Sequence, residues 1–193
     1  MFAGKSTYIM IAVRKHVMKG DRALCVRYQR DNRYSDRCLA SHDQFLTEAI
    51  SASTIEQVIK QLVMSADVIF IDEGQFFKDI YTGVMKLLDA GKHVFVSGLT
   101  LDYRRKVWEG SDFHKLFLEA DTQTTLHAIC FNCPNNAPFT RRLNDKHKQT
   151  ELIGGSETYA PSCRRCHGIE ITPAMLRCYR ARCKQLRILN QSK

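Results

Sequence analysis

The chain has no long apolar run. None of its hydrophobic stretches approaches the roughly 20 residues that a helix needs to span a bilayer. It also lacks a basic N-terminal segment followed by an apolar one, so secretion is not indicated. These two absences argue against a membrane partner and a secretory route, and we expect a soluble, cytoplasmic protein.

Internal repeats and low-complexity linkers are absent as well, so neither a repeat architecture nor a long flexible linker is expected. The 193 residues are 44% hydrophobic and 25% charged, which is ordinary for a globular protein. A chain of this length can hold one α/β core and a small appendage.

Acidic residues are nearly missing from residues 168–193, where Glu170 stands against six Lys and Arg. This tail therefore carries +5 of the net charge of +9. A basic tail could contact nucleic acid or an anionic surface. Aromatic residues do not alternate with its basic residues to form a stacking platform. We therefore expect a solvated and partly disordered terminus, and we do not expect nucleic acid as a partner.

Cysteine, by contrast, is plentiful. Eight cysteines in an intracellular chain favour metal or structural roles over disulfides. Cys130-x2-Cys133 and Cys163-x2-Cys166, with 29 residues between the pairs, match the spacing of a structural zinc site. Four thiolates leave no open coordination position, so we expect structural Zn²⁺. The alternatives are four free thiols, or His167 in place of Cys166.

Hydrophobic spacing predicts an α/β fold. Apolar residues recur at helical spacing over residues 6–19, 53–64 and 80–90, and strand-type runs cover residues 23–28, 67–72 and 93–97. Ser53 and Glu56 form a candidate capping box, and Gly20 and Gly91 are the expected helix stops. Strands that alternate with helices indicate a parallel sheet with right-handed crossovers.

The pattern changes after Asp121. Short β-type segments over residues 124–129, 139–142 and 159–162 surround the paired cysteines. The expected organisation is a nucleotide-binding α/β domain, a small cysteine-bearing domain and a basic tail, with bounds 1–124, 125–167 and 168–193.

The chain starts with a phosphate-binding signal. Gly4-Lys5-Ser6-Thr7 matches the second half of a P-loop, in which backbone N–H groups and a helix N-terminus face the phosphates. Lys5 would reach the β- and γ-phosphates of ATP, and the Ser6 hydroxyl would bind Mg²⁺. The first glycine of the signature would fall two residues before Met1, so we expect a nucleotide-binding protein shortened at its N-terminus. Alone, such a triplet is also common in basic turns.

A second half-site strengthens this interpretation. Val68-Ile69-Phe70-Ile71 is followed by Asp72 and Glu73, as in a strand that carries its acids to the ligand-binding edge of a parallel sheet. Asp72 would hold Mg²⁺, and Glu73 would remain available as a base. The alternative is a solvent-facing strand end.

Several segments occur in an order that resembles one family. They are Phe2-Ala3-Gly4-Lys5-Ser6-Thr7, Asp31-Asn32-Arg33-Tyr34-Ser35, Ser41-His42-Asp43, Asp72-Glu73-Gly74-Gln75-Phe76-Phe77, the four-cysteine spacing and Leu152-Ile153-Gly154-Gly155-Ser156-Glu157-Thr158-Tyr159. Together they closely resemble the cytosolic, or type II, thymidine kinases from residue 1 to about residue 167.

The resemblance implies a RecA-like P-loop parallel sheet with a small zinc-ribbon-like C-terminal domain. It also implies ATP-dependent transfer of the γ-phosphoryl group to the 5′-hydroxyl of thymidine, and less well of deoxyuridine, giving dTMP for nucleotide salvage. A homotetramer and feedback inhibition by dTTP belong to the same expectation.

The resemblance also assigns roles to residues. Glu73 is the general base, and Ser6 and Asp72 serve Mg²⁺. The residues expected to bind ATP or its phosphates are Gly4, Lys5, Ser6, Thr7, Asp31 and Arg33. Those expected to bind the nucleoside are Phe76, Leu99, Tyr103, Trp108, Thr140, Leu152, Ile153, Gly154, Gly155 and Tyr159.

Each assignment has a plainer alternative. Asp31 and Arg33 could be an exposed turn pair, Phe76 could be core, and Gly154-Gly155 could be a hairpin turn. Family members commonly have Leu-Asp at Leu99-Thr100 and Pro-Phe at Val107-Trp108; a Trp there would narrow the pocket. Two other functions compete: a zinc-ribbon P-loop ATPase acting on nucleic acid, and a non-catalytic, truncated product.

Overall fold

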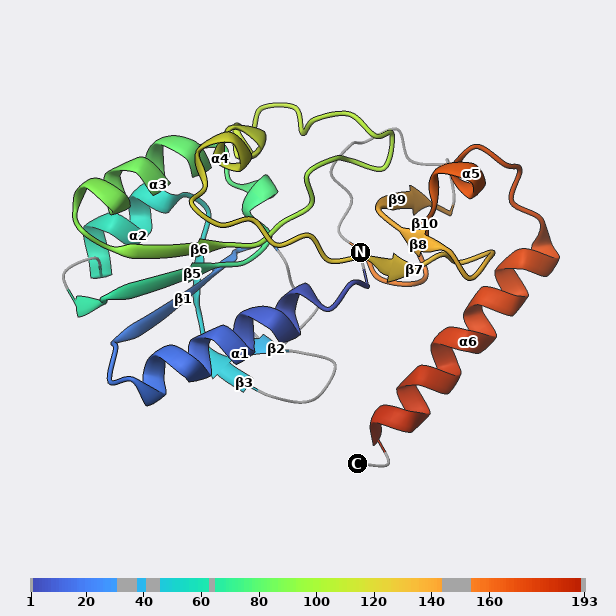
Figure 1. Cartoon of the computed structure of the whole chain (residues 1–193), viewed down its shortest axis with the longest axis horizontal. Helices are drawn as coiled ribbons and strands as arrows, with labels where there is room; N and C mark the ends of the chain where they lie inside the picture. The colour runs from blue at the N-terminus through green and yellow to red at the C-terminus, as the bar shows by residue number, and fades with distance from the viewer. Residues whose placement is uncertain (1, 31–37, 41–45, 63–64, 144–153, 192–193) are drawn as a thin grey trace. The chain divides into compact units, whose positions relative to one another are not determined.

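The computed structural model describes residues 2–30, 38–40, 46–62, 65–143 and 154–191, which form two compact units (Figure 1). The sheet unit contains Lys5–Thr100 and Val107–Thr124. The cysteine unit contains Met1–Gly4, Leu101–Lys106 and Thr125–Lys193. Within these described ranges, no helix is long and apolar enough to cross a membrane.

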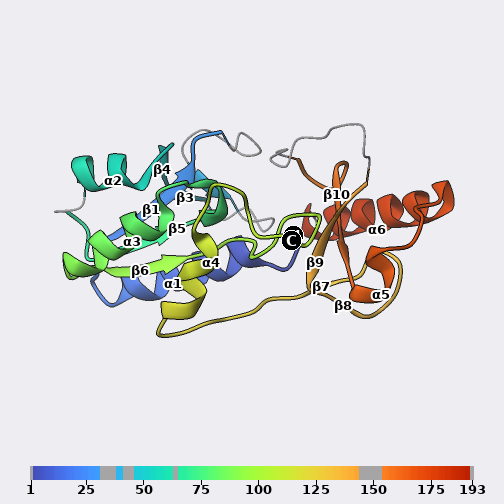
Figure 2. The ribbon, with the colours of Figure 1, turned by 90° about the horizontal axis from the view of Figure 1, so that it is seen from above.

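The sheet unit is built on four parallel strands in the order β4-β1-β5-β6, as Figures 1 and 2 show. Their bounds are β1 Ala23–Tyr28, β4 Ile50–Ala52, β5 Val68–Ile71 and β6 His93–Val96. The register places Val26 opposite both Ile50 and Ile71. A separate antiparallel pair joins β2, Cys38–Ala40, to β3, Leu46–Glu48. The predicted parallel α/β sheet is confirmed.

Helices cover both faces of this sheet (Figure 1). They are α1 Lys5–Met18, α2 Ile55–Leu62, the 3-10 turn η2 Gly74–Phe76, α3 Ile80–Asp89 and α4 Phe113–Glu119. On one face, α1 packs Ile9 and Val13 against Phe70. On the other face, α2, α3 and α4 enclose the larger core around Ile69 and Ile71. Because both faces are covered, β5 is buried throughout.

The ends of the helices can be compared with the helix stops and the capping box predicted from the sequence. Gly20 and Gly91 have φ angles of 92° and 70°, in the left-handed region that glycine tolerates, and both end their helices as predicted. The Ser53–Glu56 capping box is wrong. The Ser53 N–H and hydroxyl donate instead to Gln57 Oε1, and the first N–H groups of α2 donate to the carboxylate of Asp79. The local cap lies one residue further on, because Thr54 Oγ1 accepts from the Gln57 N–H at 3.3 Å. The contribution of Asp79, the residue before α3, comes from a distant part of the chain and leaves no local pattern.

The described part of the cysteine unit contains two small antiparallel strand pairs and two helices, which can be followed in Figures 1 and 2. Its elements are β7 Ala128–Ile129 with β8 Asn136–Ala137, β9 Phe139–Arg142 with β10 Tyr159–Ser162, α5 Arg164–His167 and α6 Pro173–Gln191. The cysteines of both pairs lie in its core with Phe131 and Tyr179.

The basic tail is not a disordered terminus, because most of it forms α6. Tyr179 is 5% exposed, meets the ring of Phe131 edge-on at 6.2 Å, and donates its hydroxyl to the Tyr159 carbonyl at 3.2 Å. Met175 and Cys183 pack beside it, at the spacing of one helix face. Our expectation of disorder weighed overall charge and missed this stripe, which anchors the helix although α6 also carries five Arg and Lys residues.

Candidate functional site

The predicted phosphate-binding segment is a glycine followed by a helix start. Gly4 has a φ of 78°, in the left-handed region, and α1 begins at the next residue. Lys5, Ser6 and Thr7 form the first turn of α1. The first N–H groups of a helix have no partner within it and carry the positive end of its dipole. This turn therefore has the chemistry of an anion site.

Asp72 leaves the carboxyl end of β5 and is 7% exposed. Its carboxylate accepts hydrogen bonds from Ser6 Oγ at 3.3 Å, from the Glu73 N–H at 2.9 Å and from Ser97 Oγ. The buried carboxylate thus joins the first turn of α1 to the end of the neighbouring strand β6.

Glu73 is held in an unusual backbone conformation. Its φ of 53° is rare for a residue with a side chain and costs about 1 kcal/mol or more. Its carboxylate accepts a hydrogen bond from Gln75 Nε2 at 2.7 Å and lies 3.9 Å from Lys5 Nζ. Gln75, which is 2% exposed, accepts in turn from the Leu99 N–H at 3.0 Å. The Glu73 side chain is therefore oriented by a buried amide.

Sequence reasoning missed Gln75 and Ser97, although each carried a signal. Gln75 follows Glu73 by two positions within the Asp-Glu-Gly-Gln-Phe-Phe string, and Ser97 ends the next predicted strand. Because the carboxyl ends of parallel strands meet at one edge of the sheet, a hydroxyl there is placed to reach Asp72.

Burial raises the pKa of the Asp72 carboxyl, and the neighbouring charge of Glu73 raises it further, while Lys5 opposes both. The two adjacent carboxylates of Asp72 and Glu73 and the hydroxyl of Ser6 form a set of hard oxygen ligands. Such a set suits a divalent cation such as Mg²⁺, and a bound cation would offset the cost of the buried charge.

The Asp72→Asn variant is expected to be more stable than the parent protein at about pH 8 and to lose that advantage as the pH falls through the raised pKa of Asp72 towards the ordinary aspartate value of about 4. The raised pKa of Asp72 means that its ionised form destabilises the fold above that pKa, and protonation removes the cost. Thermal unfolding without added cation measures the difference, which we expect to be about 2–4 °C at the higher pH. Asp121→Asn, at an exposed position, is the control. A less stable Asp72→Asn protein at high pH would contradict this account.

Three predicted nucleoside-binding residues lie together in the sheet unit. Trp108 Nε1 donates to the Leu99 carbonyl at 2.8 Å, and the Trp108 ring meets Phe76 edge-on at 5.4 Å. Phe77 is fully buried in the core, whereas Phe76 is half-buried. Phe76 therefore forms part of an apolar group with Leu99 and Trp108.

The other described candidates belong to the cysteine unit. His167 Nε2 lies 3.1 Å from the Tyr103 carbonyl and 3.4 Å from the Thr140 carbonyl, so it links the segment 101–106 to β9. Thr140 and Tyr159 are buried on β9 and β10.

Gly155 closes the turn that leads into β10, because its carbonyl accepts from the N–H groups of Thr158 and Tyr159. Gly154 precedes this turn. Asp31, Arg33, Leu152 and Ile153 lie outside the described residues.

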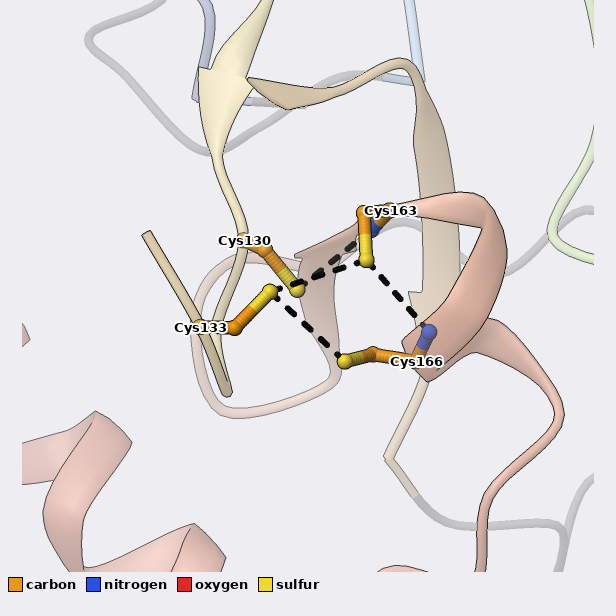
Figure 3. Close-up of side chains that lie close together, drawn as sticks. All are labelled: Cys130, Cys133, Cys163 and Cys166. Atoms are coloured by element: carbon orange, nitrogen blue, oxygen red, sulfur yellow. Dashed lines mark hydrogen bonds between the residues drawn. The ribbon is translucent and has the colours of Figure 1, made fainter. Parts of the chain in front are cut away.

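The four paired cysteines converge, and Figure 3 shows their side chains pointing toward one another. Their four Sγ atoms all lie within 4.8 Å of one another. Cys130 Sγ accepts from the Cys163 N–H and Cys163 Sγ from the Cys166 N–H, each at 3.4 Å. The latter bond lowers the pKa of Cys163 to about 7. The predicted four-cysteine group is confirmed, and it has the ligand set of a tetrahedral zinc site.

The alternative ligand His167 is engaged elsewhere, since its Nε2 faces the carbonyls of Tyr103 and Thr140. Cys166 is the fourth member of the group, and its sulfur also accepts from Asn132 Nδ2 at 3.7 Å.

A family model and similar known proteins all point to one family. A family model described as thymidine kinase matches residues 1–167. The thymidine kinase of Sheeppox virus (strain KS-1) is 36% identical over 170 residues, which cover 88% of this chain and 93% of that protein. The cytosolic thymidine kinases of Gallus gallus and Homo sapiens are 38% and 36% identical over 167 residues, covering 86% of this chain and 73% and 69% of theirs.

Proposed function

The chain belongs to the thymidine kinase family, and from that premise we propose that it transfers the γ-phosphoryl group of ATP to the 5′-hydroxyl of thymidine, giving dTMP. The observation that carries the proposal is the meeting of two sequence motifs: Ser6, in the first turn of α1, donates to Asp72, and Lys5 lies 3.9 Å from Glu73. An anion site thus adjoins a pair of carboxylates at the ligand-binding edge of the sheet.

Phosphates and Mg²⁺ would bind at the start of α1. Lys5 and the backbone N–H groups of the Gly4–Thr7 segment contact the phosphates, and Ser6 and Asp72 hold Mg²⁺. When bound, Mg²⁺ neutralises charge that develops on the phosphate oxygens. The resemblance adds Asp31 and Arg33 near the phosphates and the 5′-oxygen.

Glu73 would act as the general base. A primary hydroxyl is a weak nucleophile, so its proton must move to an acceptor as the new P–O bond forms. The bond from Gln75 Nε2 orients the Glu73 carboxylate, and the ammonium of Lys5 lies beside it. The unfavourable φ of Glu73 is consistent with a side chain whose position is set by function.

The nucleoside would be bound through its flat apolar faces and its polar edge. The proposed residues are Phe76, Leu99 and Trp108 of the sheet unit, with Tyr103, Thr140, Gly154, Gly155 and Tyr159 of the cysteine unit and Leu152 and Ile153. An apolar pocket gains only about 1–3 kcal/mol from a methyl group. Deoxyuridine should therefore be used less well than thymidine and not be excluded.

The proposal also includes a cytoplasmic location, which the sequence itself suggested. A homotetramer and feedback inhibition by dTTP come from the resemblance alone. Zn²⁺ is the proposed occupant of the four-cysteine group. Such an ion would have a structural role, since four thiolates fill its coordination shell.

A phosphorylation assay tests the proposed function. The zinc-loaded protein with γ-labelled ATP and Mg²⁺ should form labelled dTMP from thymidine, and EDTA should abolish the product. Deoxyuridine should give a lower kcat/KM than thymidine. ATP hydrolysis that is stimulated by single-stranded DNA, without transfer to thymidine, would support the nucleic-acid ATPase instead.

A further inference from the structure

Arg142 is a buried cation that none of the roles above uses. It ends β9, is 3% exposed, and faces Tyr159 of β10 across the antiparallel pair. A guanidinium is rarely buried this deeply unless its surroundings compensate for lost hydration. Its neighbours therefore indicate what it does.

Those neighbours are two aromatic residues expected to bind the nucleoside. The guanidinium carbon of Arg142 lies 3.8 Å from the centre of the Tyr103 ring, within cation–π distance. Arg142 Nη2 also donates to the Tyr159 hydroxyl at 2.9 Å. One planar group thus stacks on the first ring while it anchors the second, and both side chains belong to the cysteine unit.

The backbone that carries Tyr103 is held by further contacts besides that of its ring with Arg142. Asp102 is buried, and its carboxylate accepts from the N–H groups of Arg104 and Lys106 and from Arg104 Nε. His167 Nε2 also lies 3.1 Å from the Tyr103 carbonyl. The segment 101–106 is therefore a closed turn, and the Tyr103 ring rests on Arg142.

We propose that Arg142 is a positioning residue, which holds Tyr103 and Tyr159 as a preformed aromatic wall for the pyrimidine ring. The inference rests on the proposed function, because it takes the nucleoside to be the ligand of these two side chains. A wall that is ordered before binding lowers the entropy lost on binding. Lysine would replace Arg142 only in part, since an ammonium keeps the charge but cannot stack as a plane and donate sideways at once.

Nucleoside binding and phosphoryl transfer would depend on different residues. Lys5, Ser6, Asp72 and Glu73 all belong to the sheet unit, whereas Arg142 and its two partners belong to the cysteine unit. Loss of Arg142 should therefore weaken nucleoside binding and leave phosphoryl transfer nearly intact. A purely structural role in β9 would lower stability without this selectivity.

Steady-state kinetics of the zinc-loaded protein test this. Arg142→Met should raise the KM for thymidine about tenfold or more, with kcat within about threefold and the KM for ATP unchanged. Arg142→Lys should recover part of the loss. Tyr159→Phe should raise the KM for thymidine by a smaller factor. In the double variant Arg142→Met/Tyr159→Phe, the free-energy cost of thymidine binding should be less than the sum of the two single costs, since the two residues share one hydrogen bond. Arg164→Met, at an exposed position of α5, is the matched control.

Hydrogen exchange gives a second readout that needs no substrate. Amides of residues 101–106 should exchange faster in Arg142→Met and Arg142→Lys, with melting temperatures measured alongside. An unchanged KM for thymidine together with unchanged exchange at residues 101–106 would overturn the inference. If Arg142→Met does not fold, the same two measurements on Arg142→Lys and Tyr159→Phe test the inference instead. If the parent protein does not phosphorylate thymidine, the proposed function fails, and the exchange data alone support or overturn the positioning of Tyr103.

Discussion

Glu73→Gln should lower kcat for thymidine phosphorylation by about 10²–10⁴-fold, the range that general-base catalysis contributes. The substitution keeps the size of the side chain, and its amide oxygen can still accept from Gln75 Nε2. It cannot accept the proton of the 5′-hydroxyl. The loss should therefore fall on kcat, with little change in the KM values.

Rapid-quench or steady-state kinetics with circular dichroism would measure this effect and verify the fold. Glu170→Gln, at an exposed position in the cysteine unit, controls for the removal of one negative charge. Full activity in the Glu73→Gln protein would remove Glu73 as the base. Asp31, the other acid that the resemblance places near the 5′-oxygen, would then be the residue to test.

Cys163→Ser should abolish metal binding and unfold much of the cysteine unit. Cys163 lies at the centre of the N–H to sulfur bonds, accepting from Cys166 and donating to Cys130. Metal binding at four-cysteine sites contributes directly to folding, by about 10–16 kcal/mol in small zinc domains. Losing even a few kcal/mol should lower the melting temperature by about 10 °C or more in a chain of this size.

Two measurements would test this prediction: the metal content of the Cys163→Ser protein by atomic absorption, and its melting temperature by thermal unfolding. The matched control is Cys178→Ser, because Cys178 is exposed on α6 and lies outside the four-cysteine group. The control should keep one zinc per chain and the parent melting temperature, and a chelator should reduce the parent protein to the behaviour of Cys163→Ser. Retained zinc and an unchanged melting temperature in Cys163→Ser would contradict a structural metal.

The sheet was predictable where a single segment carries its own signal. The apolar run Val68–Ile71 is buried on every residue, as expected for a strand covered on both faces. β4, Ile50–Ala52, was not predicted, because three residues show no period and its pairing with β1 arises only in the folded sheet. α4, Phe113–Glu119, was missed for the same reason: seven residues give too few turns for a clear stripe.

In the candidate site, too, some residues could be predicted from the sequence and others could not. Lys5, Ser6, Asp72 and Glu73 stand in short motifs whose chemistry is recognisable from the residues alone. The residues that orient these side chains do not stand in recognisable motifs. Ser97, for example, reaches Asp72 only because β6 lies beside β5 in the folded sheet. Arg142 gave no signal either, because its meaning depends on Tyr103 and Tyr159, which are distant in sequence.

The anchoring of α6 couples the C-terminal helix to the four-cysteine group. Tyr179 and Cys183 pack into the same core as the four ligand cysteines, and Arg182 donates to the carbonyl of Phe131, the residue that follows Cys130. Docking of α6 and retention of the metal must then favour each other by the same free energy, as linked equilibria require. The family match ends at residue 167, yet a helix beyond that boundary would help to set the affinity of the four-cysteine group for the proposed Zn²⁺.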